Sequence, residues 1–85
     1  MSYTILFKNS ASKQLRQLPK NMLGKVASAI DDLADEPRPV NCKKLKDATD
    51  SYRIRIGDYR VIYTVDDVTV TVEVVKVGNR KDIYE

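Results

Sequence analysis

One stretch of the chain decides the fold, and it reads Ser51-Tyr52-Arg53-Ile54-Arg55-Ile56-Gly57-Asp58-Tyr59-Arg60-Val61-Ile62-Tyr63. Apolar and polar residues alternate on both sides of a Gly-Asp pair, which is typical of a β-hairpin with one buried face. Glycine in the first loop position suits a type II′ turn. If Gly57 and Asp58 form a two-residue loop, Arg55 lies directly opposite Arg60. The stretch therefore predicts a hairpin with one apolar face and one arginine face.

Directly opposed residues of a hairpin share a face, so the predicted apolar face collects Tyr52, Ile54, Ile56, Tyr59, Val61 and Tyr63. The other face carries Arg53, Arg55 and Arg60. Like charges opposed across a ladder destabilise it, whereas arginine suits bidentate contacts with phosphate groups. We therefore interpret the arginine face as a binding surface for an anionic partner. The alternative is an ordinary solvated outer face.

Length and composition restrict the class of protein. The 85 residues predict a single domain spanning residues 1–85. The one cysteine, Cys42, allows no internal disulfide and fits a reducing compartment. The sequence has no apolar run of membrane-spanning length and no signal-peptide pattern at its start, so we expect a cytoplasmic protein without a membrane partner. The absence of histidine excludes histidine-based catalysis and argues against a zinc site, so we expect neither metal nor cofactor.

Charge is distributed unevenly along the chain. The net charge is +3, yet the segment from residue 37 to residue 60 holds seven Lys or Arg against three Asp, a local charge of +4. Acidic residues gather just before it, at Asp31, Asp32, Asp35 and Glu36. A segregated basic region favours an anionic partner such as nucleic acid.

The residues before the hairpin predict a strand and two helices. Alternation indicates a strand over residues 3–8, and helices are expected over residues 10–18 and 19–34. Proline is tolerated in the first turn of a helix, so Pro19 opens the second one. The second helix presents an apolar stripe at three- and four-residue spacing, formed by Met22, Val26, Ile30 and Leu33. The short connection implies an antiparallel helical hairpin that packs on the sheet.

A basic connection and a third strand complete the predicted fold. The connection, residues 40–50, carries Lys43, Lys44 and Lys46, which either contact an anion or belong to a solvated loop. An Asp66-Asp67 loop then leads into a strand over residues 68–77, which places Glu73 opposite Arg60. The fold class is α+β: an N-terminal strand, an antiparallel helical hairpin and a three-stranded antiparallel meander, forming one sheet with helices on one face.

Two motifs resemble a known family. The hairpin is similar to that of the RelE/ParE toxin superfamily, and its RelE branch is indicated by the ending Val77-Gly78-Asn79-Arg80-Lys81-Asp82-Ile83-Tyr84. The resemblance implies the toxin of a type II toxin–antitoxin system, an endoribonuclease that cleaves mRNA in the ribosomal A site and inhibits translation. It also implies a cognate RelB-like antitoxin as partner, beside the ribosome and mRNA, with DNA contacted only through a toxin–antitoxin complex at its operator.

The resemblance further implies the residues of the site. Arg60 and Arg80 match family arginines that would grip the scissile phosphate, and Tyr84 matches a tyrosine that would stack on a base or orient a hydroxyl. The predicted catalytic set is Arg55, Arg60, Arg80 and Tyr84, and the predicted substrate-binding set is Arg53, Lys43, Lys44 and Lys46.

The general base is not evident in these sets. Arg53 and Arg55 replace lysines of well-known relatives, and arginine is a poor proton acceptor. Glu73 is either that base or a bridge that positions Arg60.

Two other functions remain open on the sequence. A ParE-like protein would inhibit DNA gyrase without enzymatic activity, and it would not need the set of Arg55, Arg60, Arg80 and Tyr84. A plain nucleic-acid-binding module would use the same basic face and cleave nothing.

Overall fold

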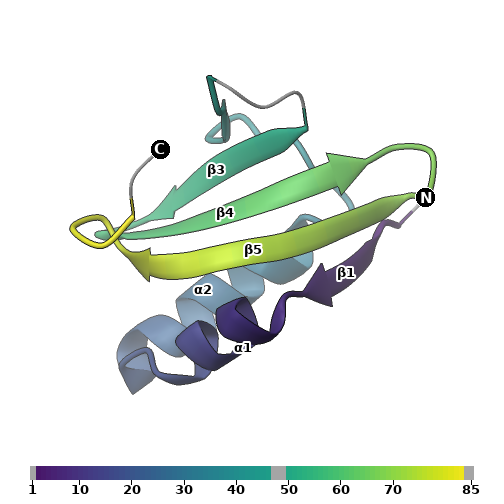
Figure 1. The fold of residues 1–85 in the computed structure, drawn as a ribbon. Helices are drawn as coiled ribbons and strands as arrows, with labels where there is room; N and C mark the ends of the chain where they lie inside the picture. Colours follow the sequence, from purple (N-terminus) through teal and green to yellow (C-terminus); the bar gives the residue numbers. More distant parts are fainter. Residues whose placement is uncertain (1, 47–49, 84–85) are drawn as a thin grey trace.

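The computed structural model describes residues 2–46 and 50–83. A five-stranded sheet has two helices on one face (Figure 1). The elements in chain order are β1 (Thr4–Phe7), α1 (Asn9–Arg16), α2 (Lys20–Asp32), β2 (Lys43–Lys44), β3 (Ser51–Ile56), β4 (Tyr59–Asp66) and β5 (Thr71–Asn79). The predicted order of strand, two helices and meander is confirmed, and a short extra strand, β2, joins the sheet.

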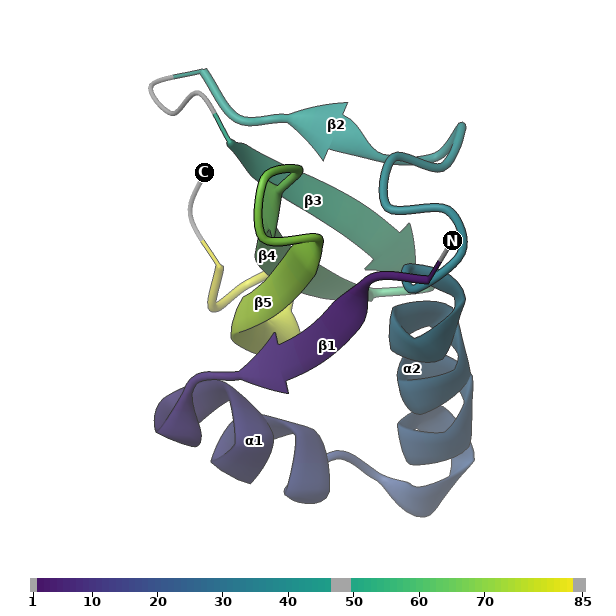
Figure 2. The same cartoon turned by 90° about the vertical axis from the view of Figure 1, so that its right-hand side faces the viewer.

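The strand order is β1-β5-β4-β3-β2, with β1 parallel to β5 and the other neighbours antiparallel. The chain therefore returns to its beginning, because the first and last strands lie side by side (Figure 2). α1 packs against β5 and α2 packs against β3. No helix in the described part of the chain is long and apolar enough to span a membrane.

The core lies between the sheet and the helices, as the alternation in the hairpin predicts. Ile54 and Tyr63 are buried in it, with 2% and 0% of their surfaces exposed, and Ile56 packs against it. From α2, the predicted stripe contributes Val26 and Ile30, which are also buried. Each buried aliphatic side chain of this kind stabilises the fold by about 1.5–3 kcal/mol relative to exposure.

The predicted register of the β3–β4 hairpin is confirmed, with Arg55 paired to Arg60. Gly57 has a φ of 60°, which the first position of a type II′ turn requires. Glycine adopts this left-handed conformation without the steric penalty of a Cβ atom. The turn therefore fixes which residues of the two strands oppose each other.

The predicted register of β4 against β5 is wrong. β4 continues to Asp66, which pairs with Thr71, so the loop holds four residues and not two. The Asp66 carboxylate accepts hydrogen bonds from the backbone N–H groups of Val68 and Thr69, at 2.9 and 3.2 Å. This turn, which is closed by the Asp66 side chain, replaces the expected two-residue hairpin loop. An Asp-Asp pair does not favour such a loop, because it lacks the glycine that two-residue loops prefer.

A β-bulge shifts the register of β4 against β5 a second time. The register changes between Ile62 and Tyr63, whose partners on β5 are Lys76 and Val74. Val75 is the extra residue of the bulge. Beyond it, the residue opposite Arg60 is Gly78, and Glu73 lies opposite Thr64.

A polar cluster connects the segment that follows α2 to the end of the sheet opposite the β3–β4 turn. The Arg38 guanidinium forms an ion pair with Asp67 at 2.8 Å, donates to the Tyr52 hydroxyl at 2.9 Å and lies 5.3 Å from the centre of that ring. The Tyr3 hydroxyl donates to the same carboxylate at 2.7 Å. These donors, Arg38 first, hold the pKa of Asp67 below its usual range. Arg38 belongs to the basic segment of the sequence, but here it is engaged in structure.

Candidate functional site

The candidate site is the face of the sheet that points away from the helices, at the end where β3 and β4 turn. Arg55 and Arg60 are directly paired there, which places both arginines on the same face of adjacent strands. Arg55 is exposed and Arg60 is half-buried. Because a hydrogen-bonded sheet carries them, their backbones are fixed before any ligand arrives. Such preorganised cations suit a phosphate group whose charge increases during a reaction.

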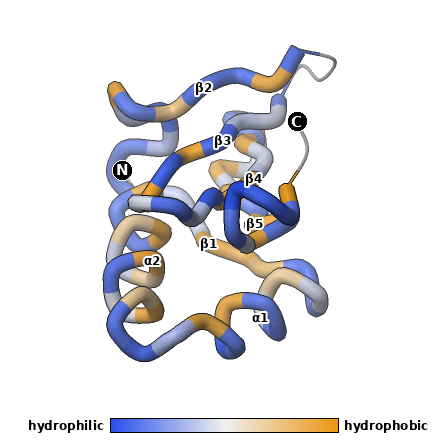
Figure 3. Tube along the Cα trace, turned by 90° about the vertical axis from the view of Figure 1, so that its left-hand side faces the viewer, coloured by the Kyte–Doolittle hydropathy of each residue, from blue (hydrophilic) through white to orange (hydrophobic). Residues whose placement is uncertain are grey.

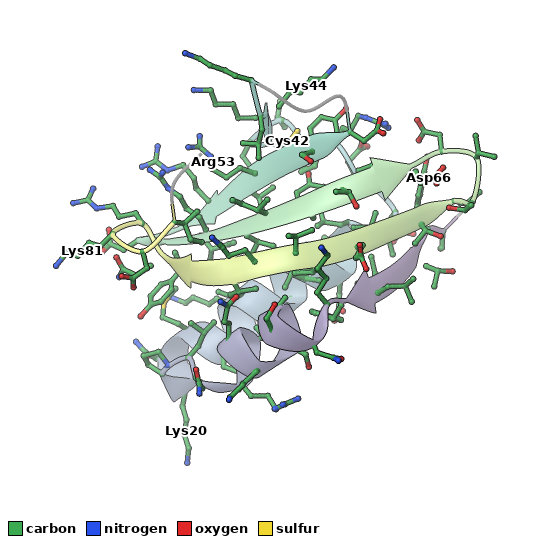
Figure 4. The ribbon with its side chains drawn as sticks, in the orientation of Figure 1. Lys20, Cys42, Lys44, Arg53, Asp66 and Lys81 are labelled. Carbon is green, nitrogen blue, oxygen red and sulfur yellow. The ribbon has the colours of Figure 1, made fainter. Side chains whose placement is uncertain are left out.

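Arg53 extends the arginine face along β3. Figure 4 labels its side chain on β3. It is half-buried and paired with Ile62 on β4 and with Lys43 on the short edge strand β2. Ile62 is in turn paired with Lys76 of β5. One row across the sheet therefore carries Lys43, Arg53 and Lys76, so the basic surface spans four strands. The sequence pattern alone does not place Lys76 in this row, because its position depends on the bulge in β5.

Arg80 lies in the turn that follows β5, and it is exposed. Its backbone N–H donates to the carbonyl of Asp58 at 2.8 Å, which fastens this turn to the β3–β4 turn. Gly78, two residues earlier, is the partner of Arg60. Arg80 is thus held at the same end of the sheet as Arg55 and Arg60, although it comes from the far end of the chain.

The remaining predicted residues are placed differently. Lys44 is opposite Tyr52, so it belongs to the other face of the sheet, and Lys46 is exposed just after β2. Tyr84 lies outside the described residues.

The expected position of Glu73 beside Arg60 is corrected by the structure. Glu73 is five residues from Gly78 along β5, which is about 16 Å in an extended strand. The bulge and the longer loop cause this separation. Glu73 therefore neither bridges to Arg60 nor serves as the base beside it.

Other features of this end of the molecule bear on cofactors and ligands. A hollow of about 310 Å³ lies on the helix side of the end of β5, lined in part by Gln14, Gln17, Tyr59 and Asn79. The Gln14 side chain accepts a hydrogen bond from the Val77 N–H at 2.9 Å there, so part of its polar lining supports the sheet edge. Within residues 2–46 and 50–83, no three His, Cys, Asp or Glu side chains lie close enough to hold a metal ion.

The arrangement defines a small α+β protein with a covered apolar sheet face and an open cationic one. A family model described as the ParE toxin of type II toxin–antitoxin systems matches residues 5–84. The chain is 35% identical over 85 residues to Toxin RelG of Mycobacterium tuberculosis, covering 99% of this chain and 98% of the relative. It is 30% identical over 83 residues to the mRNA interferase toxin RelE of Escherichia coli, covering 95% and 86%.

Solved structures agree with the sequence matches. The archaeal RelE–RelB complex from Pyrococcus horikoshii contains a chain with a TM-score of 0.84 and 32% identity, covering 98% of this chain and 100% of that one. The RelBE2 toxin–antitoxin complex from Mycobacterium tuberculosis gives a TM-score of 0.80 and 33% identity, covering 94% and 100%. The chain belongs to the RelE/ParE family of toxins of type II toxin–antitoxin systems.

Proposed function

We propose that this toxin is a ribosome-dependent endoribonuclease that cleaves mRNA in the ribosomal A site and so inhibits translation. The observation that carries the proposal is the pairing of Arg55 with Arg60 on a rigid sheet, with Arg80 fastened to the same end. The mRNA interferase name of the E. coli relative supports it.

The chemistry asks three things of the site. A ribose 2′-OH attacks its own 3′-phosphate, so the reacting groups must be aligned, the 2′ proton must leave, and a more anionic transition state must be stabilised before the 5′ oxygen departs. Arg60 and Arg80 serve the third need by gripping the scissile phosphate. Arg55 adds a further cation beside them, and Tyr84 stacks on a base or orients a hydroxyl. Arg53 and Lys43 contact the RNA backbone, while Lys44 and Lys46 serve at the periphery.

Among the described residues, no evident proton acceptor lies beside the paired arginines. Arginine does not accept protons in proteins, and Glu73 lies away from the paired arginines. We assign proton transfer to the RNA and the ribosome, which explains why the ribosome is required. Efficient cleavage of free RNA by the purified protein alone would overturn this assignment.

A RelB-like antitoxin completes the proposal. The Pyrococcus horikoshii, Mycobacterium tuberculosis and Escherichia coli neighbours are chains of toxin–antitoxin complexes. An antitoxin segment with an acidic helix would cover the arginine face and order as it binds. The ribosomal target places the toxin in the cytoplasm.

The test is a translating extract in which message ends are mapped after addition of the protein. Wild type should arrest translation and produce cuts within codons. Arg60→Ala should slow single-turnover cleavage by about 10²–10³-fold, the usual loss for a preorganised donor at a developing negative charge. The matched control is Arg16→Ala on α1, whose guanidinium bonds to Ser12 at 3.0 Å, and it should cleave like wild type. Intact message with wild type would contradict the proposal.

The alternative is a ParE-like inhibitor of DNA gyrase, which shares the matching family model but is not favoured, because the relatives are RelE and RelG toxins. It predicts trapped gyrase–DNA complexes and normal translation. The same extract, supplemented with gyrase and supercoiled plasmid, separates the two candidates. The RelE and RelG names of the relatives support the first one.

A further inference from the structure

Ile83, the last residue that the structure describes, is almost fully buried. Only 4% of its surface is exposed, yet it is not part of the cluster between the sheet and the helices. It follows a run of polar residues, and the trace in Figure 3 changes there from hydrophilic to hydrophobic at the end of the described chain. An isoleucine after a polar turn is buried only if the chain folds back onto an apolar surface.

The surface that receives Ile83 is the arginine face. A Cβ atom added to Gly78 would lie 3.3 Å from Cγ1 and 3.4 Å from Cδ1 of Ile83. Gly78 is paired with Arg60, and opposed residues share a face. The isoleucine therefore rests on Gly78, on the same side of the sheet as Arg60. Figures 1 and 2 agree with this placement, since the segment after β5 rises on the side away from the helices.

A second buried apolar residue lies on the same side. Ile62, paired with Arg53, is 9% exposed and is also outside the main core cluster. Two isoleucines are thus buried on the face that the arginines occupy. This face is not simply solvated: it combines a small apolar area with a cluster of cations.

Backbone hydrogen bonds hold the chain reversal between Gly78 and Ile83. The N–H of Asp82 donates to the backbone carbonyl of Asn79 at 2.8 Å. The N–H of Lys81 donates to the side-chain oxygen of Asn79 at 3.1 Å. With the bond from Arg80 to the Asp58 carbonyl, the turn is fastened at three points and closed by the isoleucine.

We propose that the contact between Ile83 and Gly78 is an anchor that sets the reactive geometry of the arginine face. Ile83 is a positioning residue, because it holds the turn that carries Arg80. Glycine at position 78 favours this contact, because even a Cβ atom there would lie 3.3 Å from Cγ1 of Ile83 and crowd it. The proposal rests on the proposed ribonuclease function, since the position of this turn matters only if Arg80 acts on a substrate.

The anchor contributes to alignment more than to ribosome binding. Lys43, Arg53 and Lys76 lie on strands of the sheet, so loss of the anchor leaves these cations in place. Misplacement of a reactive group by about 1 Å lowers a reaction rate by about 10²-fold. We therefore expect loss of the anchor to lower the maximal rate of cleavage. The ribosome concentration that gives half of the maximal rate should change little.

The activity test compares Ile83→Ala with wild type in single-turnover cleavage at increasing ribosome concentration. We expect the saturated rate to fall by about 10–100-fold, with the half-saturating concentration changed by no more than about threefold, and Ile83→Val to restore most of the rate. Val65→Ala is the matched control, because it removes core packing between sheet and helices. It should lower thermal stability without slowing the saturated rate at a temperature where it is folded. A wild-type rate for Ile83→Ala, or an equal loss in Val65→Ala, would overturn the anchor.

Gly78 provides an independent test through a double variant. Gly78→Ala should slow cleavage because its methyl group would lie 3.3 Å from Cγ1 of Ile83 and displace that side chain by a few tenths of an ångström. Ile83→Ala already removes the Cγ1 and Cδ1 atoms that this methyl group would meet, so the double variant should be no slower than Ile83→Ala alone. Losses that multiply in the double variant would show that Gly78 acts by another route and would contradict the proposed contact.

Amide hydrogen exchange distinguishes failure of the anchor from failure of the proposed ribonuclease function. In Ile83→Ala, the amide hydrogens of Arg80 and Asp82 should exchange at least 10-fold faster, while that of Val72 in β5 should keep its wild-type rate. If wild type cleaves no message but this pattern is seen, the ribonuclease proposal fails and the structural anchor stands. Unchanged exchange at Arg80 and Asp82 would overturn the anchor whatever the activity.

Discussion

Tyr63 shows how single residues hold the loop between the helices and the sheet. Its ring is fully buried and stacks on Tyr52, with ring centres 5.9 Å apart. Its hydroxyl donates to the carbonyl of Pro37 at 2.8 Å, and the next residue, Arg38, reaches Tyr52 and Asp67. The two tyrosines thus connect the core to the ion pair at the surface. The cluster lies at the end of the sheet opposite the arginines, so it can be altered without touching the candidate site.

Removal of the Tyr63 hydroxyl should destabilise the protein in a pH-dependent way. Tyr63→Phe leaves the Pro37 carbonyl without its donor, which costs about 1–2 kcal/mol in the free energy of unfolding and lowers the Tm by about 5–10 °C at pH 7. Burial raises the pKa of Tyr63 above its usual value of about 10. Its neutral form is therefore favoured in the folded state, and this contribution is present below about pH 10 and lost as the pH rises beyond it.

Thermal unfolding between pH 7 and pH 11 checks both parts of this prediction. The Tm of wild type should fall more steeply above about pH 10 than that of Tyr63→Phe. Parallel alkaline decreases in the two proteins would contradict a raised pKa at this position. Cleavage activity at pH 7 should be unchanged, because Tyr63 lies on the buried face of the sheet.

At the scale of elements, the loop between β4 and β5 contains a strained residue. Val70 has a φ of 55°, the left-handed region that β-branched residues strongly disfavour. The conformation costs about 1–2 kcal/mol for such a residue, whereas asparagine tolerates it. Val70→Asn should therefore raise the free energy of unfolding by about 0.5–1 kcal/mol. Chemical denaturation measures the gain, and Val68→Asn, at a residue that is 92% exposed in the same loop, should show none.

Elements with a clear period could be predicted from the sequence. The alternation around Gly57 gave the β3–β4 register, and the three- and four-residue spacing of Val26 and Ile30 gave α2. The register of β5 could not be obtained in this way, because a bulge changes the strand's alternation at one residue. The consecutive residues Val74 and Val75 are the signal that could have located it. The assumption of a two-residue Asp66-Asp67 loop, together with the missed bulge, placed Glu73 beside the arginines.

The candidate site was predictable only where it lies within one hairpin. Arg55 and Arg60 are neighbours through local pairing, which the turn determines. Arg80 reaches them through a backbone bond to Asp58, and Ile83 through the absence of a side chain at Gly78. Such contacts between distant segments leave no periodic pattern in the sequence. Here the family resemblance indicated Arg80, and only the structure indicated Ile83.

At the scale of the whole molecule, basic residues lie at both ends of the sheet. Arg38 forms an ion pair with Asp67 at one end, and Arg55, Arg60 and Arg80 lie at the other. The local charge of +4 that the sequence shows is therefore not one patch. An anionic partner should meet the arginine face first, and the strength of this encounter should depend on salt.

The salt dependence of RNA binding tests this separation. For a fluorescent single-stranded RNA, each phosphate contact contributes about 0.7 to the slope of log K against log salt concentration. Arg55→Ala and Arg60→Ala should each reduce that slope by about 0.7, whereas Arg16→Ala on the helix side should leave it unchanged, because only the first two remove a cation from the arginine face. Fluorescence anisotropy between about 50 and 200 mM salt measures the three slopes. Equal reductions in all three variants would mean that the net charge of +3, and not the arginine face, attracts the RNA.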